Sequence, residues 1–221
     1  MHKIRLICFD FDGTIADTMP VLESNAVKLF LKYHPELGLE KARNNYRSTT
    51  GLPFEQQVEL IFPRNVTNHD LIEEFEKLKL ETIFDQHLFN ETTEVLSKLK
   101  SKKFLIAISS STYKEIITEY LNKNGVLKLI DTVLGYRPGF EKGKDHFNFL
   151  KEKYELNSKS ILFIGDSLKD MERAFLSQVN FIGRTSIMNK AEDFVYKTDN
   201  DSKIKYPTIN NLTGIFQFLN N

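Results

Sequence analysis

Two aspartates, one residue apart, follow the first apolar stretch of this chain. Residues 4–9 are mostly apolar, and Asp10 and Asp12 come directly after them, just before Gly13. Such a run predicts a buried parallel strand whose carboxyl end delivers both carboxylates to a loop, where Gly13 permits a tight turn. Carboxylates placed there can bind a hard cation such as Mg2+, and one can act as a nucleophile or an acid. Alone, the pattern also fits a strand followed by an ordinary Asp-Gly turn.

Two later apolar runs also end in polar residues that suit such a site. The first ends in Ser109 and Ser110, and the second is followed by Asp166 and Asp170. Parallel strands present their carboxyl ends at one edge of a sheet, so we expect Asp10, Ser109 and Asp166 to converge on one crevice. Taken alone, the serines fit a helix cap, and the two later aspartates fit a strand-to-helix turn.

A parallel sheet is the element that must hold these strand ends together. After Asp17 no strand is predicted for about seventy residues, and apolar residues recur at helical spacing in residues 20–33, 53–62 and 71–84. Beyond them, strands are predicted at 104–108, 132–134, 161–164 and 181–182, with helices at 93–100, 113–122, 146–154, 171–178 and, after a polar loop, 212–219. This alternation predicts a parallel α/β sheet with right-handed crossovers, interrupted by a helical insert.

The composition is that of an ordinary globular protein. The 221 residues are 41% hydrophobic and 27% charged, and 30 basic residues balance 30 acidic ones, so no bulk field favours nucleic acid or an anionic membrane. The single cysteine, Cys8, suits a reducing compartment. Apolar stretches stay below the roughly 18 residues of a membrane span, and the first residues lack a signal-peptide pattern. We expect a cytoplasmic protein with neither a nucleic-acid nor a membrane partner.

The motifs resemble those of the haloacid dehalogenase-like (HAD) superfamily of aspartate-nucleophile phosphotransferases. The segment DFDGT at residues 10–14 matches the DxDGT motif, and GDSLKD at residues 165–170 matches the GDSxxD motif. The strand that ends at Ser109 is similar to the second motif. The third motif is a lysine before a helix, often within Lys-Pro-x-Pro-Asp. This chain departs from it and offers Lys142 and Lys144, of which Lys142 lies nearer the usual distance.

The resemblance implies a phosphoryl transfer in two steps. Asp10 would attack phosphorus and form an aspartyl-phosphate, while Asp12 would protonate the leaving oxygen and then take a proton from the hydrolytic water. Mg2+ would be held by Asp10, the backbone carbonyl of Asp12, and Asp166. The activity implied is that of a Mg2+-dependent phosphatase acting on a small phosphomonoester.

The resemblance also assigns roles to neighbouring side chains. The hydroxyl of Ser109 and the amide of Ser110 would donate hydrogen bonds to the transferring phosphate. Lys142 or Lys144 would offset the repulsion between the aspartates and the phosphate, and the other lysine would be solvated. Asp170 would reach a metal-bound water or the lysine.

The helical insert, residues 17–87, resembles in position the cap of phosphoglycolate phosphatase-like and phosphoglucomutase-like members. The remainder, residues 1–16 and 88–221, would form the Rossmann-like HAD core. In this family the cap closes over the cleft and selects the substrate. The segment TTGLPFEQQ resembles a cap loop that is turned toward the active site, and its residues expected to face the substrate are Gly51, Leu52, Pro53 and Phe54.

Other functions of the same fold are disfavoured by single residues. A phosphoglucomutase-like transferase typically has a cap histidine where this chain has Leu22, and an arginine for a second phosphate where it has Phe54. A dehalogenase has no need of Asp12. A catalytically silent binding protein would keep crowded aspartates at a cost without a metal. We expect a small phosphorylated metabolite as the partner, and a monomer or weak dimer.

Overall fold

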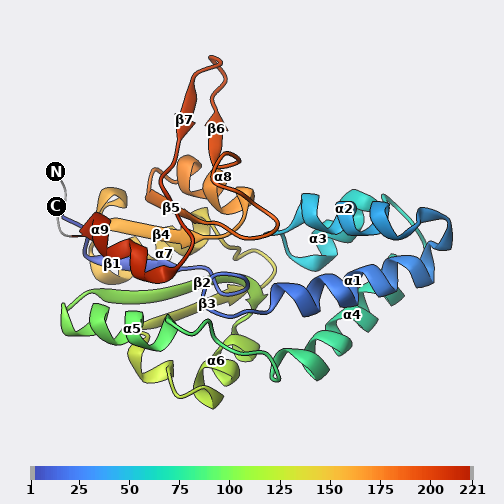
Figure 1. Cartoon of the computed structure of the whole chain (residues 1–221), viewed down its shortest axis with the longest axis horizontal. Helices are drawn as coiled ribbons and strands as arrows, with labels where there is room; N and C mark the ends of the chain where they lie inside the picture. Colours follow the sequence, from blue (N-terminus) through green and yellow to red (C-terminus); the bar gives the residue numbers. More distant parts are fainter. Residues whose placement is uncertain (1–2, 220–221) are drawn as a thin grey trace. The chain divides into compact units, whose positions relative to one another are not determined.

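Two compact units make up the protein, which is described by a computed structural model over residues 3–219. One unit is Asp17–His87, called here the helical unit, and the other comprises the remaining described residues, called the sheet unit (Figure 1). The chain leaves the sheet unit after its first strand and returns to it before its second. Within residues 3–219, no helix is both long and apolar enough to cross a membrane.

Six parallel strands form the central sheet of the sheet unit, in the order β3-β2-β1-β4-β5-β8. Their bounds are β1 Leu6–Phe9, β2 Leu105–Tyr113, β3 Thr132–Tyr136, β4 Ile161–Gly165, β5 Asn180–Arg184 and β8 Thr208–Ile209. β1 lies between β2 and β4, and Phe9 is in register with Ile108 and Ile164. The residues that follow these three positions therefore meet at one edge. The predicted parallel α/β sheet is confirmed.

Helices cover both faces of this sheet. Their bounds are α5 Thr92–Ser101, α6 Lys114–Lys123, α7 Lys144–Tyr154, α8 Leu168–Leu176 and α9 Phe216–Leu219. In Figure 1, α5 and α6 lie on one side of the sheet and α8 lies on the other. Cys8 of β1 and Phe163 of β4 share a buried cluster with Phe147 of α7 and Met171 of α8. Each large apolar side chain in it contributes roughly 1.5–3 kcal/mol, so the cluster holds α7 and α8 against the sheet.

The helical unit has a core of its own. Its helices are α1 Met19–Tyr33, α2 Leu39–Thr49, α3 Phe54–Ile61 and α4 Asn68–Ile83. The ring of Phe54 stacks on that of Phe75, with centroids 3.5 Å apart, and lies 6.1 Å from that of Phe30. The sequence pattern did not predict α2, because Ala42 and Tyr46 are its only buried side chains and leave too sparse an apolar stripe.

Two parts of the sheet unit differ from the predicted elements. β2 runs on through the serines to Tyr113, although the strand was predicted to end at residue 108, and its ladder with β3 is irregular between Ser109 and Tyr113. The antiparallel hairpin of β6 Val195–Lys197 and β7 Lys203–Lys205 was not predicted, because its strands are only three residues long and lack buried side chains. Figure 1 shows this hairpin projecting from the sheet.

Candidate active site

Asp10 lies just past the end of β1, at the centre of the sheet edge. Its amide donates to the carbonyl of Ile164 on β4 at 2.8 Å, and the residue is only 4% exposed. The chain then turns back sharply, since the amide of Gly13 donates to the carbonyl of Ala16 at 2.9 Å. Gly13 has a φ of +74°, a conformation that glycine adopts without strain. This turn holds the Asp10 carboxylate at the edge where ligands bind in such sheets.

Lys142 is the lysine that the structure brings to Asp10. Its Nζ lies 2.7 Å from Oδ1 of Asp10 and 2.6 Å from Oδ1 of Asp170, and its side chain is 2% exposed. Burial alone would favour the neutral amine, but the two carboxylates raise the pKa of Lys142 and keep it charged. Lys144, the other candidate, is exposed at the start of α7. The geometry therefore favours Lys142 over Lys144.

The turn from β4 into α8 places Asp166 and Asp170 beside Asp10. Ser167 caps α8, since its side chain accepts from the amide of Asp170 at 3.1 Å, and Asp170 accepts in return from the amide of Ser167. A Cβ on Gly165 would lie 2.5 Å from Oδ2 of Asp170. Only glycine leaves room for this carboxylate at that position, which ties the Gly-Asp-Ser sequence to the site.

Three buried carboxylates, those of Asp10, Asp166 and Asp170, offer ligand oxygens that all lie within 4.8 Å of one another. Burial raises the pKa of Asp10 to about 7 despite the opposing charge of Lys142. Burial, with the charges of Asp10 and Asp170, raises the pKa of Asp166 well above its usual value. One lysine does not neutralise three carboxylates. A hard divalent cation with oxygen ligands would do so, and the donor set fits Mg2+.

Asp12, whose charge adds to the raised pKa values of Asp10 and Asp166, also contacts β2. Its Oδ2 accepts a hydrogen bond from the hydroxyl of Thr112 at 2.7 Å, across 100 positions of sequence. The amide of Thr112 donates to the Ser110 hydroxyl at 3.0 Å. Sequence reasoning missed Thr112, although it stands in the same polar run as the serines. Its place two residues beyond Ser110, on a strand whose side chains alternate, was the available signal.

The hydroxyl of Ser109 contacts a buried histidine, and its predicted role toward phosphate stays a prediction. Its Oγ lies 2.8 Å from Nδ1 of His146 on α7, and both residues are 0% exposed. The cause is strand parity, because Ser109 shares a face with Ala107, whose side chain belongs to the cluster packed against α7. Ser110, on the opposite parity, is also buried.

The predicted substrate-facing segment of the helical unit has one side chain in that unit's own core. Pro53 and Phe54 are buried, and the Phe54 ring is stacked in the unit's own core. The Phe54 ring is more stable packed against Phe75 than exposed to water. The expectation that Phe54 faces the substrate stays a prediction. Gly51 and Leu52 are partly exposed.

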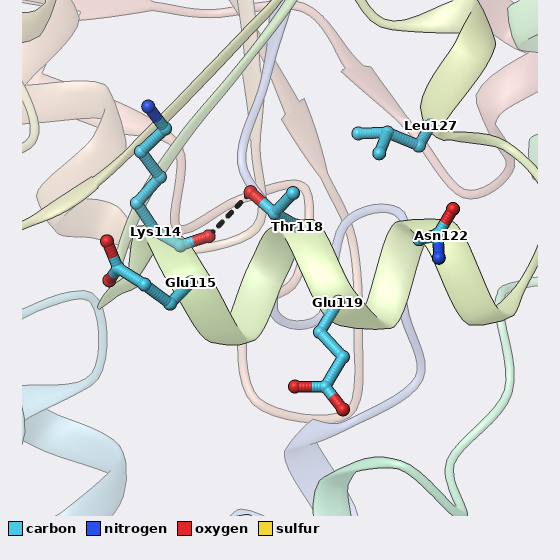
Figure 2. Close-up of a pocket in the computed structure, with 6 residues that line it drawn as sticks. All are labelled: Lys114, Glu115, Thr118, Glu119, Asn122 and Leu127. Atoms are coloured by element: carbon cyan, nitrogen blue, oxygen red, sulfur yellow. Dashed lines mark hydrogen bonds between the residues drawn. The ribbon is translucent and has the colours of Figure 1, made fainter.

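A separate pocket lies along α6, and Figure 2 shows its lining. It is lined by Lys114, Glu115, Thr118, Glu119, Asn122 and Leu127. The only hydrogen bond drawn there runs within the helix, from the Thr118 hydroxyl to the carbonyl of Lys114 at 2.8 Å. None of the predicted site residues lines this pocket, so the candidate chemistry stays at the sheet edge.

Buried carboxylates at the carboxyl edge of a parallel sheet, with a lysine between two of them, define an α/β enzyme site that can hold a cation. The sequence profile of haloacid dehalogenase-like hydrolases matches residues 7–184. The chain therefore belongs to the haloacid dehalogenase-like hydrolase family, and the resemblance seen in its motifs is confirmed.

Individual relatives agree with this assignment. A protein from Aliivibrio fischeri named phosphoglycolate phosphatase is 27% identical over 188 residues, which cover 78% of this chain and 80% of the relative. A predicted phosphatase from Clostridium acetobutylicum aligns with a TM-score of 0.80 at 17% identity over 99% of both chains. A HAD hydrolase from Bacillus subtilis, solved bound to magnesium, aligns with a TM-score of 0.69 at 18% identity over 100% of both chains. These two structural matches show a shared fold.

Proposed function

We propose that this protein is a Mg2+-dependent phosphatase that hydrolyses a small phosphomonoester through an aspartyl-phosphate on Asp10. The observation that supports this most is the position of Lys142, which lies within hydrogen-bond distance of both Asp10 and Asp170 in a buried site. A buried carboxylate with a fixed cation beside it is suited to attack a dianionic phosphate, because the cation lowers the repulsion between them.

Each site residue has its own role in the two steps of the proposed reaction. A carboxylate oxygen of Asp10 forms the new bond to phosphorus as the bond to the ester oxygen breaks, and Asp12 gives that oxygen its proton. In the second step water attacks the aspartyl-phosphate, Asp12 takes the water's proton, and phosphate leaves. The amide and hydroxyl of Ser110 and the ammonium of Lys142 bind the transferring oxygens.

Mg2+ completes the proposed site. Asp10, Asp166 and the backbone carbonyl of Asp12 would hold it, with Asp170 supporting Lys142. When bound, the ion neutralises charge on the phosphate and on the aspartates. The pKa of Asp10, about 7, and the raised pKa of Asp166 reflect buried negative charge, which a bound cation would neutralise. The magnesium in the Bacillus subtilis relative is consistent with this choice of metal.

The substrate is proposed from the relatives and from the helical unit. The Aliivibrio fischeri relative is named phosphoglycolate phosphatase, which makes phosphoglycolate the first ester to test. We propose that residues 17–87 act as the cap, with the partly exposed Gly51 and Leu52 in the segment that meets the substrate.

The test is phosphate release from a panel of small phosphomonoesters, including phosphoglycolate, sugar phosphates and p-nitrophenyl phosphate. Turnover should require Mg2+ and should disappear in Asp10→Asn, whose amide cannot attack phosphorus. Turnover that persists in folded Asp10→Asn would exclude the aspartyl-phosphate. Interconversion of sugar phosphate isomers faster than phosphate release would indicate a mutase, and a folded protein that does not bind Mg2+ in calorimetry would indicate a silent fold.

A further inference from the structure

Thr112 is a buried residue that the proposed mechanism does not use. It is 3% exposed, and its hydroxyl donates to Oδ2 of Asp12 at 2.7 Å. We infer that Thr112 is a positioning residue that orients the Asp12 carboxylate for proton transfer to the leaving oxygen. This inference rests on the proposed function, in which Asp12 is the general acid.

The backbone around Thr112 is built to hold it there. The β2–β3 ladder is irregular between Ser109 and Tyr113, and such irregularities re-aim side chains next to active sites. Gly135 of β3 lies so close that a Cβ on it would be 2.7 Å from the carbonyl oxygen of Thr112 and 2.2 Å from the amide nitrogen of Lys114. The segment that carries Thr112 is thus seated directly on β3, where only glycine permits the approach.

The direction of this hydrogen bond decides which Asp12 oxygen carries the proton. A carboxylic acid has one hydroxyl oxygen and one carbonyl oxygen, and a donor facing Oδ2 favours Oδ2 as the acceptor. The proton then resides on Oδ1, the oxygen from which we infer that it passes to the leaving group. The Thr112 amide bonds the Ser110 hydroxyl at 3.0 Å, so the same residue joins the acid to the proposed phosphate-binding serine.

The experiment compares two substrates whose leaving groups differ in their need for a proton. The alcohol oxygen of phosphoglycolate, or of the best alkyl ester of the panel, leaves as an alkoxide unless it is protonated. In contrast, p-nitrophenolate leaves readily without a proton. The ratio kcat/KM covers steps only up to the irreversible departure of this group, so later hydrolysis of the aspartyl-phosphate does not enter. Thr112→Val removes the hydroxyl at nearly constant shape, and Thr112→Ser restores it.

We expect Thr112→Val to lower kcat/KM for the alkyl ester by roughly tenfold or more, a share of the 10²–10⁴-fold that general acid catalysis provides. The same variant should change kcat/KM for p-nitrophenyl phosphate less than about threefold, and Thr112→Ser should restore the wild-type ratio of the two. Thr118→Val is the matched control, because the Thr118 hydroxyl donates to the Lys114 carbonyl within its own helix. This control variant should leave kcat/KM for both substrates unchanged.

Two outcomes would overturn the inference. Equal losses of kcat/KM on both substrates would show that Thr112 has only a structural role in the site. Unchanged kcat/KM values in Thr112→Val would show that Asp12 needs no hydrogen bond from Thr112. The wild-type protein tests the proposed function separately. If it cleaves neither ester, the proposed function is wrong, and this is known before any Thr112 variant is measured. The melting temperature of each variant, with and without Mg2+, shows whether it is folded.

Discussion

At the residue scale, Lys142 and Lys144 form a natural comparison, because they are two positions apart and differ in burial. Lys142→Met removes the cation between Asp10 and Asp170. We expect kcat/KM to fall by about 10²–10³, as for the loss of one transition-state donor. Lys144→Met, on the exposed start of α7, should change kcat/KM less than about twofold, since surface charges act weakly.

The measurement is initial-rate kinetics on the best ester, with melting curves to confirm that both variants fold. Equal losses in the two variants would contradict the assignment of Lys142. Loss in Lys144→Met alone would move the phosphate-binding role to that lysine.

We expect His146 to make folding stability depend on pH. Burial, with the nearby charge of Lys142, lowers the pKa of His146 to about 3 from 6.5. Between these two pKa values His146 binds a proton in the unfolded chain but stays neutral in the folded protein. The free energy of unfolding therefore falls as pH decreases below 6.5. The loss should reach about 2 kcal/mol at pH 5. In His146→Gln, which can still bond Ser109 and does not titrate, this loss should be absent.

Urea unfolding of wild type and His146→Gln at pH 7.5 and pH 5 checks this, because other titrating groups affect both proteins alike. The matched control is His69→Gln, whose side chain is 87% exposed on the helical unit. If wild type and His146→Gln lose the same stability between the two pH values, His146 is not held neutral by burial.

At the element scale, one buried ion pair joins the end of β5 to the start of α5, and its arginine also bonds the turn after Asp10. Nη1 of Arg184 lies 2.9 Å from Oε1 of Glu91 and donates to the carbonyl of Thr14 at 3.1 Å. The side chains of Arg184 and Glu91 are 6% and 12% exposed. Arg184→Met leaves Glu91 buried without its cationic partner, although the Leu212 amide still donates to it, so we expect a loss of about 3 kcal/mol in unfolding free energy.

The comparison pair is Lys169 and Glu172, which are 2.7 Å apart but 42% and 39% exposed. Lys169→Met should cost less than about 1 kcal/mol, because water and salt screen an exposed pair. Urea unfolding measures both, and the double variant Arg184→Met/Glu91→Gln should recover part of the loss. Similar losses at the two pairs would show that burial is not the deciding factor.

Sequence patterns predicted elements well where the apolar period was strong and failed where neighbouring elements decide. The buried strands at β1 and β4 and the turn that follows each were readable, because apolar runs end abruptly in carboxylates. The continuation of β2 beyond Ile108 was not readable, since a polar stretch joins a strand only through pairing with β3. The orientation of Ser109 toward His146 depends on that continuation.

At the scale of the whole molecule, the two units have separate hydrophobic cores. The buried cluster on the α7 and α8 face contains only residues of the sheet unit, and the stacked Phe30, Phe54 and Phe75 belong only to the helical unit. The chain crosses between the units at Ala16 and at Leu88, which form an antiparallel bridge. The two ends of the sheet unit at this boundary are therefore adjacent, so a short linker can join them.

This predicts that the sheet unit folds alone when Asp17–His87 is replaced by a short Gly-Ser linker. Cooperative thermal unfolding should remain, because the sheet and the buried cluster on its α7 and α8 face lose no member. Mg2+ should still raise the melting temperature, since Asp10, Asp166 and Asp170 all remain, and Asp166→Asn in the same variant should abolish that rise.

Discrimination among esters should weaken in this variant, because the proposed cap is gone while the groups that act on phosphorus stay. Kinetics on p-nitrophenyl phosphate and phosphoglycolate would show the two values of kcat/KM drawing closer together. A sheet unit that unfolds without residues 17–87 would mean that the helical unit stabilises the sheet. A folded sheet unit with unchanged selectivity would mean that the sheet edge, and not the helical unit, chooses the substrate.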